Sequence, residues 1–387
     1  MPDKLPDDEL AMLVALRHDL HAHPELGFEE ARTAELLATK LEEAGVTVHR
    51  GLGVTGVVGT LTRGNGPGRI ALRADMDALA MPELTGLPYT SQNPGRMHAC
   101  GHDGHSVMLL GAARALARDG GFNGTVHFIF QPAEEGRGGA QRMVDDGFFD
   151  RFPVDRVYGL HNMPGLDPDE MAVVEGPQLA SSDRWEVLFT GTGTHGAKPH
   201  LGRDAVTAAG AFLTAIHTIV ARVVDPLSPA VVSACALSAG DFNALNVIPD
   251  SVRVGGTSRA YSPGVRDQLE TELRQIAGGI AATYGIEAAF DYRRGMPPVV
   301  NDPDATARAL KAARVAVPKV RTSFPPSTAG DDFAIFSHRV PGCYVWLGNG
   351  PAVDGALHHN TRYDFNDAAI ASGVAFWTAL VMGELTG

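Results

Sequence analysis

The sequence predicts an α/β protein with two domains. Strand-like and helix-like segments alternate from the N-terminus to about residue 160, which is typical of helices packed on a mostly parallel sheet. From residue 183 the order becomes β-α-β-β-α-β, the ferredoxin-like arrangement. The length of 387 residues also exceeds one typical core. We therefore expect a main domain at 1–182 and 295–387, interrupted by an inserted domain at 183–294.

The first part of the chain should form the main sheet and its covering helices. A helix over 7–20 begins with acidic side chains, which suit the positive end of the helix dipole. A second helix over 28–44 ends at Gly45, and a third over 105–118 is followed by a Gly-Gly stop signal. Short β-rich runs predict strands at 54–61, 69–76, 125–130 and 156–160.

The inserted domain should combine two helices with four strands. Its helices are expected at 204–224 and 263–284, and its strands at 184–190, 230–237, 251–259 and 287–292. The most apolar helical run contains His217 and Arg222, so we interpret it as a buried amphipathic helix and not as a membrane span. The main domain then resumes with a helix over 304–315, a strand over 343–347 and a closing helix from Asp367.

The composition restricts the partners of the chain. The 32 basic and 45 acidic residues give a net charge of −13, which argues against nucleic acid and membrane surfaces because both attract basic proteins. Cys100, Cys235 and Cys343 are too few for a disulfide framework, so a reducing cytoplasm is expected. The first residues are acidic and lack an apolar core, unlike a secretory signal.

A scattered set of metal-binding side chains is the strongest functional signal. Successive members of this set are 2, 33, 26 and 198 residues apart, namely Cys100, His102, Glu135, His161 and His359. Thiolate, imidazole and carboxylate together suit a catalytic divalent transition metal, and a bridging thiolate would allow two ions. We expect zinc or manganese, while cobalt or nickel is also compatible with these donors.

Local features of the chain agree with a metal centre. Cys100 and His102 can face one centre if the chain between them is a loop, and Gly101 permits such a bend. We interpret His105 and His127 as structural histidines. An isolated cysteine is more often a buried apolar residue, so the inference depends on the coincidence of several donors.

Two acidic residues follow the strand at 125–130, and His161 comes directly after the strand at 156–160. Ligands of open α/β sheets bind beyond the carboxyl ends of the strands. If Glu135 is a ligand, Glu134 is free to act as general base on a water whose pKa a metal lowers from ~16 toward ~7. Without the histidines, a solvated acidic loop would explain this pair equally well.

Further segments match a known pattern in order along nearly the whole chain. They lie at 17–25, 73–79, 97–105, 131–136, 159–162, 246–250, 256–259 and 363–367. With these segments the sequence resembles the bacterial N-acyl-amino-acid amidohydrolases, including hippurate hydrolases and plant auxin-conjugate hydrolases. This family is a branch of the aminoacylase and carboxypeptidase superfamily of metallopeptidases. The resemblance implies a zinc-exopeptidase-like main domain with two metal ions per subunit and a lid domain that forms homodimers or higher homo-oligomers.

The resemblance also implies roles for individual residues. It assigns metal binding to the five donors above and the role of general base to Glu134. The segment 193–200 matches a lid segment whose histidine reaches the scissile carbonyl, so His195 would stabilise the oxyanion, worth ~10²–10³ in rate. Asn246 and Arg259 match positions that hold the substrate carboxylate, which Arg can bind by a bidentate fork. Ordinary turn and surface roles remain the alternatives for these three residues.

Two departures from the family pattern concern the site. The final segment has His358 beside His359 where relatives have one histidine, and counting back four from Tyr363 selects His359 as ligand. Asp331 stands where relatives have a longer glutamate, which would alter hydrogen bonds around the ligands. Two further acids end a β run and are candidates for the same supporting role, or for turn chemistry, namely Asp75 and Asp77.

The predicted protein is thus a cytoplasmic metal-dependent amidohydrolase that cleaves N-acyl-L-amino acids to a carboxylic acid and a free amino acid. The acyl group could be acetyl or aromatic, as in hippurate. N-acetyl-diaminopimelate and small dipeptides are alternative substrates. A non-catalytic metal- or ligand-binding protein on the same fold is the alternative of a different class, against which Glu134 argues.

Overall fold

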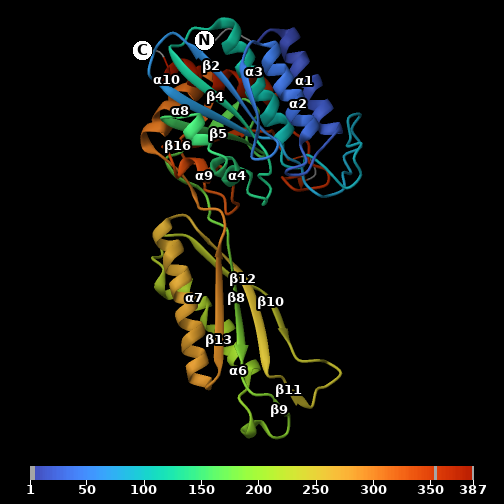
Figure 1. Cartoon of the computed structure of the whole chain (residues 1–387), viewed down its shortest axis with the longest axis vertical. Coiled ribbons are helices and arrows are strands. Elements are labelled where there is room, and N and C mark those ends of the chain that lie inside the picture. Colours follow the sequence, from blue (N-terminus) through green and yellow to red (C-terminus); the bar gives the residue numbers. More distant parts are fainter. Residues whose placement is uncertain (1–4, 353–354, 386–387) are drawn as a thin grey trace. The chain divides into compact units, whose positions relative to one another are not determined.

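The computed structural model describes residues 5–352 and 355–385, which divide into two compact units (Figure 1). The first unit combines the chain up to Gly176 with Val300–Pro325 and the chain from Asp331 onward. The second consists of Pro177–Val299 and Pro326–Gly330. This second unit is longer at both ends than the inserted domain expected at 183–294, and it includes a separate short segment.

The first unit is built on an eight-stranded sheet in the order β1-β2-β4-β3-β5-β16-β6-β15. The neighbours β4, β3, β5 and β16 are parallel, while β1, β2 and β6 join the sheet by antiparallel pairs. The strands are β1 (Thr47–Leu52), β2 (Gly56–Arg63), β3 (Arg69–Asp75), β4 (Gly124–Gln131), β5 (Arg156–Met163), β6 (Glu170–Ala172), β15 (Lys319–Arg321) and β16 (Gly342–Gly348). The predicted α/β fold with a mostly parallel sheet is confirmed.

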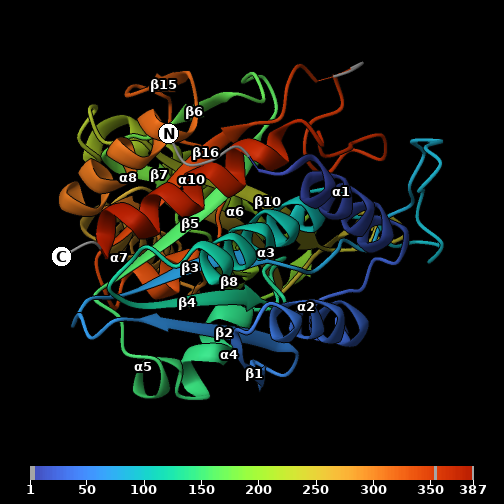
Figure 2. The ribbon, with the colours of Figure 1, turned by 90° about the horizontal axis from the view of Figure 1, so that it is seen from above.

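Helices cover both faces of this sheet (Figure 2). One layer contains α1 (Asp7–Ala22), α2 (Ala31–Glu43), α3 (His102–Asp119), α8 (Pro303–Ala316) and α10 (Ala369–Glu384). The other contains α4 (Gly139–Asp145), α5 (Phe148–Arg151) and α9 (Phe333–Ser337). Alternate residues of β4, Val126, Phe128 and Phe130, are fully buried in one core with Leu109 of α3 and Trp377 of α10. Each such side chain contributes about 1.5–3 kcal/mol by burial.

Several expectations about element bounds were wrong, including the helix expected over 204–224, which ends at Ala215. Helix α3 begins at His102, three residues before the predicted start, because Gly101 adopts a left-handed φ of 92° as its N-cap. Strand β5 does not end before His161 but continues to Met163, since β16 pairs with it along this stretch. A strand was expected from Val54, but that residue has φ 77° in the turn between β1 and β2.

The second unit has the ferredoxin-like order. Its sheet, β10-β12-β8-β13, is antiparallel throughout. The elements are β8 (Asp183–Thr190), α6 (Ala205–Ala215), β10 (Ala230–Ala239), β12 (Ser251–Ala260), α7 (Pro263–Tyr284) and β13 (Glu287–Arg294). Asp204 caps α6 by accepting from the N–H groups of Val206 and Thr207, and Ser262 caps α7. Two short pairs complete the unit and its connections: β9 (Thr194–His195) with β11 (Val247–Ile248), and β7 (Gly176–Leu179) with β14 (Val299–Asn301).

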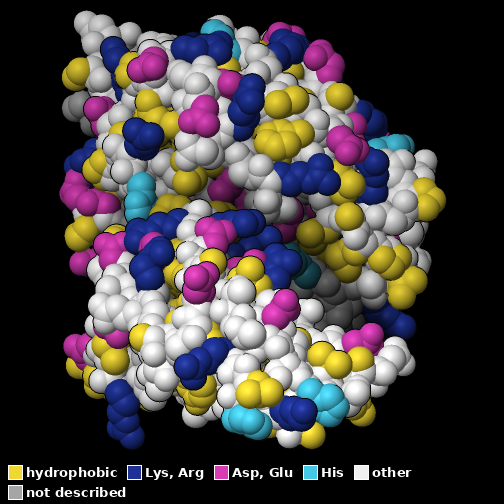
Figure 3. Space-filling view, turned by 60° about the horizontal axis from the view of Figure 1, so that its bottom comes forward, with side chains coloured by type: hydrophobic (Ala, Val, Ile, Leu, Met, Phe, Trp, Pro, Cys, Tyr) yellow, Lys and Arg dark blue, Asp and Glu magenta, His cyan; other side chains and the backbone are white. Residues whose placement is uncertain are grey.

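Across the part of the chain that the structure describes, no helix is both long and apolar enough to cross a bilayer. Basic and acidic side chains are interspersed over the face drawn in Figure 3.

Candidate metal centre

The loop before α3 brings Cys100 close to strand β5. Gly101 permits this approach, because a Cβ there would come within 2.4 Å of Asn162 Nδ2 and 2.6 Å of the Tyr363 hydroxyl oxygen. Cys100 Sγ consequently lies 3.4 Å from His161 Nε2. The side chains of both residues are buried, although 61 residues separate them in the sequence.

His102 is the first residue of α3, after Gly101 as the helix N-cap, and Asp77 orients its ring. His102 Nδ1 donates to the Asp77 carbonyl oxygen at 2.9 Å and lies 3.2 Å from its carboxylate. The remaining nitrogen, Nε2, is buried and has no hydrogen-bond partner in the described part of the chain. The Asp77 carboxylate also accepts from the backbone N–H of Glu135 at 3.0 Å. Asp77 therefore positions two predicted ligands at once.

The turn after β4 and a C-terminal segment bring Glu135 and His359 together. Glu135 Oε1 lies 3.2 Å from His359 Nε2. Two nearby non-glycine residues adopt left-handed backbone, Ala133 with φ 54° and His359 with φ 62°. The His359 N–H donates to the Ala99 carbonyl oxygen at 2.8 Å, which ties this segment to the loop of Cys100. Left-handed backbone at non-glycine residues such as Ala133 and His359 costs roughly 1–3 kcal/mol each and concentrates at functional sites.

The five predicted ligands form two groups that share one residue. The donor atoms of Cys100, His102 and His161 lie within 4.8 Å of one another, and so do those of Cys100, Glu135 and His359. A thiolate common to two groups is the arrangement required to bridge two cations. The structure thus brings together side chains that the sequence places up to 259 positions apart.

The electrostatics of the two groups favour cations. Hydrogen bonds to Cys100 and Glu135 raise the pKa of His359 to about 10. Burial lowers the pKa of His102, but the charge of Asp75 outweighs it, so that this pKa lies well above its usual value. Both imidazoles therefore hold protons that divalent cations would replace. The buried Nε2 of His102, which has no hydrogen-bond partner among the described residues, also fits a metal ligand.

Glu134 lies beside the two groups, and its carboxyl oxygen is within 4.8 Å of the donor atoms of His102 and Glu135. Its side chain is buried. Burial first, and then the charges of Asp331, Glu135 and Asp332, raise the pKa of Glu134 well above its usual value. Cations bound alongside would oppose this shift. A buried carboxyl in such a field is suited to exchange a proton with water.

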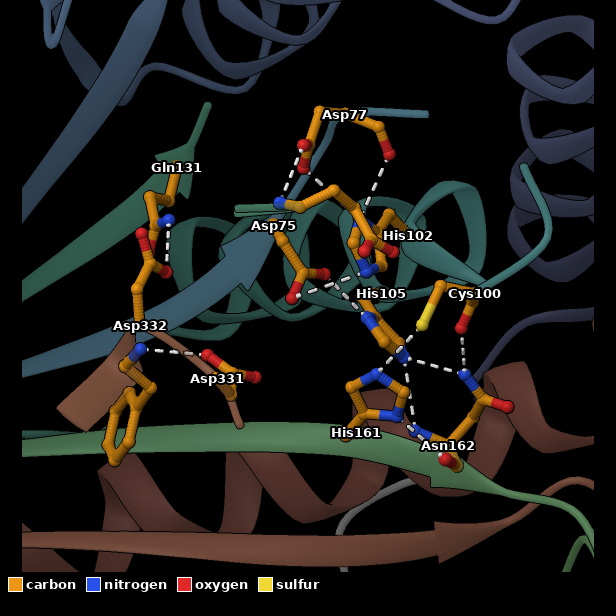
Figure 4. A network of polar contacts seen from close by, with 12 residues as sticks. Asp75, Asp77, Cys100, His102, His105, Gln131, His161, Asn162, Asp331 and Asp332 are labelled. Atoms are coloured by element: carbon orange, nitrogen blue, oxygen red, sulfur yellow. Dashed lines mark hydrogen bonds and ion pairs between the residues drawn. The ribbon is translucent and has the colours of Figure 1, made fainter. Parts of the chain in front are cut away.

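Arg73 is a buried cation behind this cluster that sequence reasoning did not identify. Its guanidinium lies 2.6 Å from Asp75, 3.1 Å from Asp331 and 3.2 Å from Asp332, and it donates to Gln131 at 2.8 Å. Figure 4 shows these carboxylates lying around the strand ends. The predicted supporting residues Asp75 and Asp331 are therefore fixed by Arg73. A signal was present, because Arg73 and Asp75 are two residues apart on β3 and share one face.

His105 has no ring nitrogen left for a metal. Its Nδ1 donates to Asp75 at 2.6 Å, and its Nε2 accepts from the Asn162 backbone N–H at 3.0 Å (Figure 4). His358 packs edge-on against the His161 ring, with 5.0 Å between the ring centroids, but its Nε2 is engaged elsewhere. Its Nε2 donates to Asn162 Oδ1 at 2.9 Å, and burial lowers its pKa to about 3. Of the two adjacent histidines, His359 is the one whose ring reaches Glu135.

The second unit carries the three remaining predicted residues, in two places. His195 on β9 and Asn246 before β11 line one hollow, and the Gly196 N–H donates to the Asn246 carbonyl oxygen at 2.6 Å. His195 is exposed, and its Nδ1 accepts from the Ala197 N–H at 3.0 Å. Nε2 of His195 is therefore the nitrogen that carries the proton, and it can donate to a ligand.

Arg259 lies elsewhere in this unit. It follows the start of β12 at Ser251 by eight residues, about 26 Å of extended chain. Its guanidinium donates to the Thr257 hydroxyl and, at 2.9 Å, to the Ser258 carbonyl oxygen. The structure therefore brings His195 and Asn246 together beside the two-stranded β9–β11 sheet, but places Arg259 near the end of β12 in the four-stranded sheet.

The arrangement is that of a known family. The profile of peptidase family M20/M25/M40 matches residues 71–383, which include all five donors and Glu134. The chain belongs to this family. This M20 member is 40% identical to the hippurate hydrolase of Campylobacter jejuni over 372 residues, 96% of each chain. It is 36% identical to the N-acetylcysteine deacetylase of Bacillus subtilis over 377 residues, again 96% of each chain.

Solved structures extend the similarity to the fold of this M20 member. A crystal structure from Bacillus subtilis, described as a dinuclear metal-binding peptidase from the M20 family, superposes with a TM-score of 0.87. The two sequences are 33% identical, and the match covers 98% of this chain and 99% of the other. The predicted resemblance to this branch of the metallopeptidases is confirmed.

Proposed function

We propose that this protein is an amidohydrolase that uses two divalent metal ions to cleave N-acyl amino acids into a carboxylic acid and a free amino acid. The observation that carries the proposal is the pair of donor groups sharing Cys100, with the buried carboxyl of Glu134 beside them. The hippurate hydrolase and N-acetylcysteine deacetylase among its relatives support this substrate class. Zinc or manganese suits the donor set, and cobalt or nickel is compatible.

Cations held by these five residues would supply Lewis acidity, which acidifies water and polarises a carbonyl. Glu134 accepts a proton from the attacking water as the water oxygen bonds to the carbonyl carbon. Glu134 then delivers that proton to the nitrogen as the C–N bond breaks. Asp77 keeps His102 and Glu135 in place throughout.

The second unit acts as the lid in this proposal. His195 donates from Nε2 to the developing oxyanion, because its Nδ1 is engaged by the Ala197 N–H. Asn246 and Arg259 hold the substrate carboxylate. Asn246 lies before β11, whereas Arg259 lies near the end of β12, about 26 Å of extended chain from the start of that strand, so we do not expect one lid to present both to one small carboxylate. This supports a homodimer, or a higher homo-oligomer, in which two copies contribute to each site.

The acyl group and the amino acid define the alternatives. Hippurate-like aromatic amides, N-acetyl amino acids, N-acetyl-diaminopimelate and small dipeptides share the carboxylate and the amide. A reducing compartment such as the cytoplasm is proposed on the three free cysteines, two of which are buried.

A substrate panel on protein of known metal content tests the proposal. The purified protein is analysed for bound metal and then assayed with hippurate, N-acetylcysteine, N-acetylmethionine, N-acetyl-diaminopimelate and a dipeptide. We expect metal-dependent release of amino acid from at least one N-acyl amino acid. Bound metal without turnover of any amide would instead favour a non-catalytic metal-binding protein.

A further inference from the structure

Asn162 is a fully buried residue whose side-chain amide uses its whole hydrogen-bonding capacity. Its Nδ2 donates to the Cys100 carbonyl oxygen at 2.6 Å and to His105 Nε2 at 3.0 Å. Its Oδ1 accepts from the Tyr363 hydroxyl at 2.7 Å and from His358 Nε2 at 2.9 Å. Figure 4 shows this amide beside Cys100 and His105. Only one orientation of the amide fits these contacts. The Cys100 carbonyl oxygen can only accept a hydrogen bond, so it must face Nδ2 and not Oδ1.

The backbone of Asn162 adds two bonds of the same kind. Its N–H donates to His105 Nε2 at 3.0 Å, and its carbonyl oxygen accepts from His161 Nδ1 at 2.7 Å. The second bond fixes the His161 tautomer, since the proton must be on Nδ1. Nε2, the nitrogen 3.4 Å from Cys100 Sγ, is thereby left with its lone pair.

These contacts join four segments that carry or flank the donors. They are the loop of Cys100, helix α3 after His102, strand β5 at His161, and the segment 358–363 that includes His359. We propose that Asn162 is a positioning residue of the metal centre, which sets the spacing between the Cys100–His161 pair and the segment that carries His359. This inference rests on the proposed function, because it requires that the donors bind divalent cations.

A buried asparagine could also contribute to folding stability alone, and the chain offers a matched control. Asn301 is buried in the same unit, donates from Nδ2 to the carbonyl oxygens of Val174 and Tyr344 at 2.8 Å, and accepts from the Tyr344 N–H at 2.7 Å. None of these contacts involves a predicted ligand. Asn162→Ala and Asn301→Ala therefore remove similar amides, but only the first touches the donors.

The experiment uses full-length protein freed of metal and titrated with Co²⁺, whose absorption reports thiolate ligation and coordination geometry. Asn162→Ala is expected to weaken Co²⁺ binding about 10- to 100-fold and to change the thiolate charge-transfer band. Asn162→Asp should do at least as much, because it places an oxygen against the Cys100 carbonyl. Asn301→Ala should lower the melting temperature and leave the Co²⁺ affinity and spectrum unchanged.

Tyr363→Phe keeps the test valid if Asn162→Ala does not fold, since it removes one bond to Asn162 and is expected to weaken Co²⁺ binding about 2- to 10-fold. Wild-type affinity and spectrum in Asn162→Ala, or in Tyr363→Phe where Asn162→Ala does not fold, would overturn the positioning role. Equal loss in Asn301→Ala would overturn it too. Wild-type protein that binds no Co²⁺ would instead refute the proposed metal centre.

Discussion

Asp77 is bonded to His102 twice over, through its carbonyl oxygen at 2.9 Å and its carboxylate at 3.2 Å from the same ring nitrogen. This contact leaves His102 Nε2 buried and without a hydrogen-bond partner among the described residues. Removal of the Asp77 side chain should therefore loosen the ring and also free the Glu135 backbone. Metal affinity in Asp77→Ala is expected to fall about 10- to 100-fold, as judged by titration with Zn²⁺.

The control for Asp77 is Asp146→Ala. Asp146 also accepts from a backbone N–H, that of Gly53 at 2.9 Å, and it bonds to no predicted ligand. The Zn²⁺ affinity of the Asp146→Ala protein should equal that of the wild type. Unchanged affinity in Asp77→Ala would show that Asp77 does not orient the ligands.

Glu134 is expected to be needed for turnover and not for metal binding. Glu134→Gln preserves the shape of the buried side chain but removes the group that accepts the water proton. The value of kcat should fall by roughly 10²–10⁴ or more, while metal content measured by elemental analysis remains that of the wild type. A variant with full activity would exclude Glu134 from the mechanism.

His359 and His358 should differ in metal stoichiometry. His359 lies with Cys100 and Glu135 in the second donor group, whereas His358 bonds to Asn162. His359→Ala is expected to lose one of the two proposed ions, and His358→Phe to retain both with lower affinity. Elemental analysis after dialysis against limiting metal measures the difference, and the reverse pattern would transfer the ligand role to His358.

His195 should affect turnover more than substrate binding. Because its Nε2 is free to donate, His195→Ala is expected to lower kcat by about 10²–10³ with a smaller change in KM. If two copies share each site, a mixture of inactive Glu134→Gln and His195→Ala proteins should recover part of the activity after exchange of subunits. A mixture that remains inactive would indicate that each site is built from one copy.

His21 predicts a pH dependence of stability that is independent of turnover. Burial lowers its pKa, but ring contacts to Asp103 at 2.9 Å and Glu83 at 3.3 Å outweigh burial and raise it to about 9, above the usual 6.5. The charged ring therefore stabilises the fold fully below pH 6.5, and this contribution disappears as the pH rises through about 9. It amounts to the order of 1–3 kcal/mol.

Unfolding in urea with a chelator present, at several values between pH 6.5 and 9, measures this contribution. His21→Gln should be less stable than the wild type at pH 6.5, and the difference should shrink toward pH 9. His200→Gln, at an exposed position of the second unit, is the control and should follow the wild-type curve. A difference that grows with pH would mean that the ring is neutral in the folded protein.

The fold was predictable where periodicity is strong and was missed where it is weak. The buried strand β4 and the helices α7 and α8 show clear patterns. Strand β1 lies at the edge of the sheet, and only its last residue, Leu52, is buried, so it has no apolar alternation to recognise. Strands β6 and β15 have three residues each, too few for any period to appear.

The predicted metal ligands could be recognised in the sequence because several thiol, imidazole and carboxylate groups occur together near predicted strand ends. Arg73, Asp332 and Asn162 were missed, because an arginine or an amide has no chemical signature until its neighbours are known. Each of them acts through hydrogen bonds to residues more than 50 positions away.

The family, the α/β class and the set of possible metal ligands could be predicted from the sequence alone. These depend only on the residue types, their order along the chain and the positions of glycines. The packing of distant segments established everything that depends on distance. It placed the His359 ring against Glu135, left Nε2 of His102 without a hydrogen-bond partner among the described residues, and surrounded Arg73 with three carboxylates. The physical reason is that hydrogen bonds and charges act over a few ångströms, and only folding brings side chains 61 or more positions apart within that range.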